Sequence, residues 1–185
     1  MSIPDPRTGR AVLIGVDTYT DLESLPSVAA GVRRLAELLC DPRVWGLPHD
    51  RITVLGSAAT ATDVRNAIVN AGRDCTGTLV LYFAGHGLRS RDGVQLHLAL
   101  RDADDGHPDI GNLTYRSVRD VLNHAAHRTS SRIVLLDCCY SGLAGAMGPG
   151  TLTRTDLRHS LSEDEDGDAV VVSGGRGGCG GAVGR

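Results

Sequence analysis

Short apolar runs alternate with amphipathic stretches along most of the chain. Aliphatic runs bounded by polar or turn-forming residues predict buried strands, and the stretches between them carry apolar residues at helical spacing, which predicts helices packed against a sheet. Strands are predicted at 11–16, 51–56, 78–87, 132–137 and 169–173, and helices at 27–40, 60–72 and 112–127.

The third predicted strand is the most apolar, because it runs without a polar residue from Leu79 to Ala84. Such a run is typical of the centre of a parallel sheet that is covered on both faces. Strands that alternate with helices of this length imply βαβ crossovers and a layered α/β fold with a mostly parallel sheet. The alternating segment 93–100 predicts a small hairpin arm, and the second helix is expected to start at a Thr60–Asp63 cap and to end at Gly72.

Composition narrows the class of protein. The 185 residues are 41% apolar and 22% charged with a formal net charge of −3, which fits one globular domain without a basic surface. Aromatic residues make up only 3%, too few for base-stacking platforms, so nucleic acid is not expected as a partner. The chain shows no membrane span or signal peptide, and its five irregularly spaced cysteines suit a reducing compartment; we therefore expect a cytoplasmic protein without a membrane partner.

The end of the chain differs in composition from the rest. The predicted domain covers residues 1–173, and within it the glycine-rich and acidic segment 145–168 is expected to be an exposed loop between the last two strands. The segment 174–185 is glycine-rich and is expected to be a flexible tail.

Two strands end in residues that can carry chemistry. The third strand leads into Gly85-His86-Gly87 and the fourth into Asp137-Cys138-Cys139. Ligands of α/β sheets gather at the carboxyl ends of the strands. If these two strands are neighbours, a histidine and a cysteine meet across one crevice, which is what a Cys/His nucleophilic pair requires.

The motifs "YFAGHG" and "DCCYSG" resemble those of the caspase-like cysteine peptidases, of the bacterial and metacaspase type. In this sequence His86 precedes Cys139 by 53 residues, close to the spacing of about 50 that is known for caspases. The resemblance covers roughly the first four fifths of the chain. It implies a caspase-like three-layer α/β/α fold and a cysteine endopeptidase that acts on peptide or protein substrates.

The resemblance also implies roles for single residues. Cys139 would be the nucleophile and His86 the general acid/base, while the backbone N–H groups of Gly87 and Cys139 would form an oxyanion hole. Cys138 should face away from Cys139, since successive side chains of an extended segment alternate. Asp137 would line the pocket for the residue before the cut and select arginine or lysine. The resemblance places Gly31 where such enzymes have a second pocket aspartate.

Regulation is predicted from the loop. Arg154 and Arg158 lie in 145–168, where caspase-like enzymes are often cut, so we expect self-cleavage there. The acidic run in 162–173 lacks the end ligands of an EF-hand but leaves calcium open as an activator. No cofactor or resident metal is expected, because His124 and His127 with two adjacent cysteines make poor zinc spacing.

Two other readings stay open. The fold of the caspase-like peptidases continues beyond its fifth strand, so the C-terminal part is expected to be short or missing here. Either a second copy or a partner chain completes the fold, or the domain is weakly active. In the latter case the chain would be a caspase-fold signalling module that binds partners. A third, less favoured reading uses "GRGGCG" at 175–180 as a nucleotide-binding loop, although no helix follows it.

Overall fold

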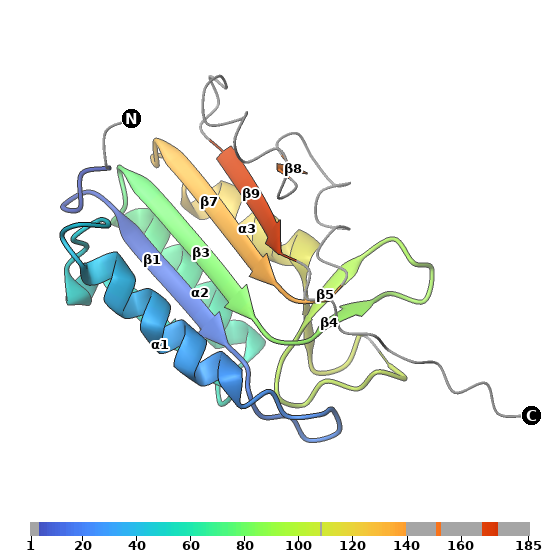
Figure 1. Cartoon of the computed structure of the whole chain (residues 1–185). Helices are drawn as coiled ribbons and strands as arrows, with labels where there is room; N and C mark the ends of the chain where they lie inside the picture. Colours follow the sequence, from blue (N-terminus) through green and yellow to red (C-terminus); the bar gives the residue numbers. More distant parts are fainter. Residues whose placement is uncertain (1–3, 108, 140–150, 153–167, 174–185) are drawn as a thin grey trace, which may run out of the picture.

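The computed structural model describes residues 4–107, 109–139, 151–152 and 168–173 (Figure 1). Its elements follow the alternation that the sequence predicts. They are β1 (Arg10–Gly15), α1 (Ser27–Cys40), a 3₁₀ turn η1 (His49–Arg51), β2 (Ile52–Leu55), α2 (Ala61–Arg73), β3 (Thr78–Ala84), β4 (Gly87–Arg89), β5 (Leu96–Ala99), β6 (Asn112–Thr114), α3 (Tyr115–Ala125), β7 (Ser131–Asp137), β8 (Thr151–Leu152) and β9 (Asp168–Ser173).

The central sheet has the order β2-β1-β3-β7-β9-β8, and each of these neighbouring pairs is parallel. Strand β3 therefore lies between β1 and β7, as its apolar run predicts. A second, antiparallel sheet of β4, β5 and β6 lies beyond the carboxyl end of β3 (Figure 1). The α/β class, the parallel sheet and the hairpin arm are confirmed, and so is the pairing of β3 with β7 on which the site hypothesis depends.

Helices cover both faces of the sheet, and each face has its own core. Alternate residues of β1, β3 and β7 pack with α2 and α3 on one face and with α1 on the other, which gives three layers (Figure 1). The first core includes Ile14, Phe83 and Leu136, together with Ile68 of α2 and Leu122 of α3. The α1 face includes Leu13, Val32, Trp45, Val80 and Ala84.

Helix α2 begins as predicted but ends differently. The Thr60 hydroxyl accepts a hydrogen bond from the Asp63 N–H and the Asp63 carboxylate accepts one from the Thr60 N–H, so the capping box is confirmed. The prediction that Gly72 ends the helix is wrong, since α2 includes it. Gly72 instead allows α3 to approach, because a β-carbon there would lie 2.9 Å from the Ala125 carbonyl oxygen.

Three short strands were not predicted. Residues 112–114 form β6, so the helix predicted at 112–127 starts at Tyr115 and ends at Ala125. Gly87–Arg89 form β4, and Thr151–Leu152 form β8 within the segment predicted to be a loop. Short strands of this kind depend on a partner strand rather than on their own pattern, which is why the local sequence does not reveal them.

No helix in the described part of the chain combines the length and apolarity that a membrane span requires. The domain limit at 173 and the tail 174–185 stay predictions, because the tail lies outside the described residues.

Candidate active site

Strand register brings the two motifs together. Ala84 of β3 pairs with Gly15 of β1 on one side and with Asp137 of β7 on the other. His86 and Cys139 each lie two residues beyond this aligned row. The histidine and the cysteine thus follow the carboxyl ends of two neighbouring parallel strands, at the same edge of the sheet.

The two adjacent cysteines have opposite environments. Cys139 is exposed, whereas Cys138 is only 5% exposed and belongs to the core on the α2 and α3 side. Burial raises the pKa of the Cys138 thiol from 9.0 to about 12, with a smaller contribution from the neighbouring Cys139 and Asp137 charges. Cys138 is therefore a buried neutral thiol, and Cys139 is the one that a substrate can reach.

Gly87 lies directly against the backbone of Cys139. A β-carbon at position 87 would be 2.1 Å from the Cys139 carbonyl oxygen and 3.1 Å from the Cys138 sulfur. Real β-carbons do not approach other atoms this closely, so only glycine allows the two segments to pack as they do. The two residues predicted to supply the oxyanion hole are consequently in contact.

The His86 imidazole is held in a defined tautomer. Its Nε2 lies 2.8 Å from the Glu23 carbonyl oxygen. A carbonyl oxygen can only accept a hydrogen bond, so Nε2 carries the proton and donates it. Nδ1 is then left as the basic nitrogen of the neutral ring, as a general base requires. Sequence reasoning gave no role to Glu23, because a backbone carbonyl leaves no signal in the residue type.

Tyr19 is a second neighbour of His86 that the sequence did not reveal. Its hydroxyl accepts a hydrogen bond from the His86 backbone N–H at 2.8 Å and donates one to the Val16 carbonyl at 3.0 Å. The two rings are tilted against each other with centroids 4.8 Å apart. Burial raises the pKa of Tyr19 to about 12, so its hydroxyl remains protonated over the physiological range.

Asp137 lies on the α1 face of the sheet edge. Ile133 and Leu135, which precede it on alternate positions of β7, pack with the α1 core. Its side chain is exposed, and one carboxylate oxygen accepts a hydrogen bond of 3.3 Å from the Tyr82 hydroxyl. Burial and then the Asp137 charge raise the pKa of Tyr82 to about 12.

A second carboxylate stands at the same edge, at the end of β1. The Ser57 hydroxyl donates a hydrogen bond of 2.5 Å to Asp17 and accepts one of 2.9 Å from the Asp17 backbone N–H. The hydroxyl's hydrogen bond lowers the pKa of Asp17 below its ordinary 3.8, so the group is ionised at neutral pH. Sequence reasoning assigned Asp17 no role, although it directly follows the first strand.

Gly31 is the position where a pocket aspartate was expected to be missing. It lies exposed within α1, and a β-carbon built there meets no atom within 4 Å. The glycine is thus not required by packing. A side chain at this position would extend into open space.

The remaining predicted residues are placed as follows. Arg154, Arg158 and the acidic residues 163–166 lie outside the described residues. His124 and His127 line a groove of about 580 Å³ between α2 and α3, together with Arg73 and Asp120. Within the described residues, no group of three or more His, Cys, Asp or Glu side chains is arranged to hold a metal ion.

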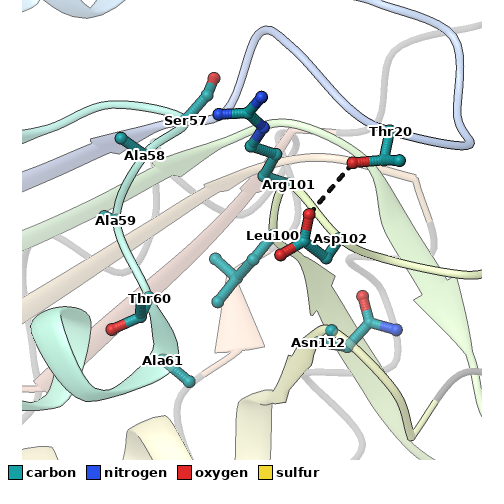
Figure 2. A pocket seen from close by; sticks show the side chains of 11 residues that line it. Thr20, Ser57, Ala58, Ala59, Thr60, Ala61, Leu100, Arg101, Asp102 and Asn112 are labelled. Atoms are coloured by element: carbon teal, nitrogen blue, oxygen red, sulfur yellow. Dashed lines mark hydrogen bonds between the residues drawn. The ribbon is translucent and has the colours of Figure 1, made fainter.

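A pocket of about 490 Å³ lies between the segment after β1, the loop before α2 and the loop after β5 (Figure 2). Thr20, Ser57, Thr60, Leu100, Arg101 and Asp102 are among its lining residues. Two of its lining residues directly follow residues that bond to the His86 backbone. Thr20 follows Tyr19, whose hydroxyl accepts from the His86 N–H, and Leu100 follows Ala99, whose N–H donates to the His86 carbonyl at 3.0 Å. None of His86, Asp137 and Cys139 lines it, so it adjoins the predicted site without containing it.

Comparison with known proteins identifies the family of the chain. No curated protein matches the chain. A family model described as the caspase domain matches residues 8–174, which include every element from β1 to β9. The chain therefore belongs to the caspase-domain family of cysteine peptidases.

Proposed function

We propose that this protein is a cysteine endopeptidase that uses Cys139 and His86 as its dyad and cleaves after arginine or lysine. One observation carries the proposal above the others. The exposed Cys139 lies against Gly87, at the end of the strand next to the one that delivers His86 with its Nε2 proton engaged. These features support the proposal, because acyl transfer needs an accessible nucleophile, an oriented base and a backbone that approaches the reacting group closely.

The proposed reaction starts with transfer of the Cys139 thiol proton to Nδ1 of His86. The thiolate attacks the scissile carbonyl carbon, and the backbone N–H groups of Gly87 and Cys139 stabilise the oxyanion that forms. His86 then gives its proton to the leaving amine as the C–N bond breaks. Water, deprotonated by His86, hydrolyses the thioester and releases the second product and Cys139. Throughout, the Glu23 carbonyl accepts from Nε2 and stabilises the imidazolium.

The preference for a basic residue rests on the charges at the sheet edge. Asp137 lies at the end of β7, two residues before the proposed nucleophile, and the ionised Asp17 stands at the end of β1 on the other side of β3. In this proposal, the guanidinium or ammonium group of the substrate's basic side chain pairs with a carboxylate of the protein. With glycine at position 31, Asp137 is the residue on which we place this selectivity.

Cleavage of fluorogenic peptides tests the proposal. Peptides that differ only in having Arg, Lys or Asp before the reporter are incubated with the wild type and with Cys139→Ala, with and without calcium. We expect release after Arg and Lys, little after Asp, and loss of at least 10³-fold in the variant, on the scale of removing a catalytic nucleophile. Release that survives in Cys139→Ala overturns the assignment of the nucleophile.

Asp137→Asn separates selectivity from chemistry. It keeps the size of the side chain and one acceptor oxygen but removes the charge. We expect the preference for Arg over an uncharged residue to fall by about tenfold or more, while Cys139 stays reactive toward small alkylating agents. If no peptide is cleaved and Cys139 is no more reactive than Cys75, the chain acts as a caspase-fold binding module that needs a partner or a second copy.

Self-processing is the regulatory part of the proposal. Arg154 and Arg158 would be cut by an enzyme of this specificity, and intact-mass analysis of the wild type and Cys139→Ala after incubation detects it. A wild-type chain that stays whole while it cleaves added peptides contradicts this part alone. The proposed cytoplasmic location is supported by free thiols at Cys40, Cys75, Cys138 and Cys139.

A further inference from the structure

We infer that Tyr19 is a positioning residue for His86, and that its hydroxyl sets the place of the imidazole relative to Cys139. The inference rests on the proposed function of His86 and goes beyond it by naming a side chain that acts through the base. Tyr19 itself does not touch the substrate in this account. Its hydroxyl bridges two backbone groups, the Val16 carbonyl at the end of β1 and the His86 N–H after β3.

The bridge continues the sheet where its own hydrogen bonds stop. The last bond between the ends of β1 and β3 runs from the Val16 N–H to the Ala84 carbonyl at 2.9 Å. Beyond it the segments that follow β1 and β3 are no longer paired directly, and the Tyr19 hydroxyl lies between them. Gly85 leaves room for it, since a β-carbon at position 85 would lie 2.6 Å from the Tyr19 hydroxyl oxygen and 3.3 Å from the Val16 carbonyl oxygen.

The Tyr19 ring fixes the imidazole from a second direction. The ring is only 7% exposed and packs against His86 with a centroid separation of 4.8 Å. Together with the Glu23 carbonyl on Nε2, this gives the imidazole one fixed atom and one fixed face. Nδ1 is therefore aimed by contacts on both the backbone and the ring of His86.

Tyr19 is itself anchored through its neighbour in the chain. The Thr20 N–H donates to the Arg101 carbonyl at 2.9 Å, and the Thr20 hydroxyl donates to the Asp102 carboxylate at 3.0 Å (Figure 2). These bonds join the segment after β1 to the loop between β5 and β6. The end of β5, which leads into this loop, is tied to His86, because the Ala99 N–H donates to the His86 carbonyl. The end of β5 and the loop that follows it therefore hold both Tyr19 and His86 in place.

The test is Tyr19→Phe, which keeps the ring and removes only the hydroxyl. Tyr115→Phe is the matched control, because Tyr115 is a buried tyrosine, 2% exposed, at the start of α3. Three quantities are measured: exchange of the His86 backbone amide with deuterium, the pH dependence of Cys139 alkylation, and kcat and KM for an Arg peptide. Thermal melting shows that each variant is folded.

If the inference holds, Tyr19→Phe speeds His86 amide exchange and slows Cys139 alkylation near neutral pH, each by about tenfold, and lowers kcat about tenfold with KM unchanged. Tyr115→Phe changes none of these. Unchanged amide exchange together with an unchanged alkylation profile overturns the inference, whatever happens to stability. If the wild type cleaves no peptide, the proposed function fails, while exchange and alkylation still decide the role of Tyr19.

Discussion

The backbone of Gly87 packs against the carbonyl group of Cys139 so closely that a β-carbon at position 87 would stand 2.1 Å from the Cys139 oxygen. This contact joins the segment that follows β3 to the segment that follows β7. It explains in steric terms why the histidine of the site is followed by glycine. It also means that the backbone around the proposed nucleophile depends on a residue 52 positions earlier in the chain.

Gly87→Ala is expected to cost about 1–3 kcal/mol of unfolding free energy, because the added methyl group must displace the Cys139 carbonyl or the Cys138 sulfur. The displacement should also move the predicted oxyanion hole, so peptide cleavage should fall by about 10²-fold or more. Chemical denaturation and initial rates measure the two effects. A variant with wild-type stability and wild-type cleavage would show that the contact is not needed.

Two helical glycines should respond to alanine with opposite signs. Gly31→Ala should stabilise the protein by about 0.5–1 kcal/mol, since the β-carbon meets open space and alanine is the better helix former. Gly72→Ala should destabilise it by about 1–3 kcal/mol, because the β-carbon would lie 2.9 Å from the backbone of Ala125 in α3. Urea unfolding of both variants checks this pair. A stabilising effect at both positions would mean that α2 and α3 separate at little cost.

Gly31→Asp should sharpen the preference for basic substrates. The position lies exposed on α1, which packs on the sheet face to which Asp137 belongs, so a carboxylate can be added there without a clash. We expect the ratio of kcat/KM for Arg over an uncharged residue to rise on the order of tenfold, and to fall again as salt is added. Gly31→Asn is the uncharged control. Equal changes in both variants would assign the effect to shape rather than to charge.

Much of this arrangement could be predicted from local sequence, and the limits have physical causes. Continuous apolar runs predicted β1, β3 and β7, since burial on both faces of a parallel sheet imposes that pattern. The same runs therefore predicted which edge of the sheet carries His86 and Cys139. Strands β4, β6 and β8 were missed because each has only two or three residues and gains its structure from a neighbour.

The supporting contacts of the site were harder to foresee. Tyr19 and Glu23 act through a hydroxyl bridge and a backbone carbonyl, and neither interaction follows from residue type or spacing. Gly72 looked like the end of α2 because glycine is common after helices. Glycine is needed at this position because α3 approaches there. The contact involves Ala125, a residue 53 positions later, so the sequence of α2 alone does not reveal it.

Alkylation should distinguish the cysteines by environment. Burial raises the pKa of Cys40, Cys75 and Cys138, in the last case to about 12, so these thiols stay protonated as pH rises through neutrality. Only the thiolate reacts, so modification of these three should be slow in the folded protein at neutral pH. Iodoacetamide at pH 7, followed by peptide mapping, should modify Cys139 at least tenfold faster. Cys138→Ala should leave that rate unchanged, and loss of the labelling in this variant would contradict the assignment.

The proposed first step is attack by Cys139, activated by His86, on the carbonyl group that follows a basic side chain. Its most direct test is covalent capture by a peptide that ends in an arginyl chloromethyl ketone, with the labelled residue located by mass spectrometry in the wild type and in His86→Ala. We expect one label per chain, on Cys139, formed at least 10²-fold more slowly in His86→Ala and more slowly with an aspartyl reagent. Labelling of Cys138 or Cys40 instead, or labelling of Cys139 at the same rate without His86, would contradict it.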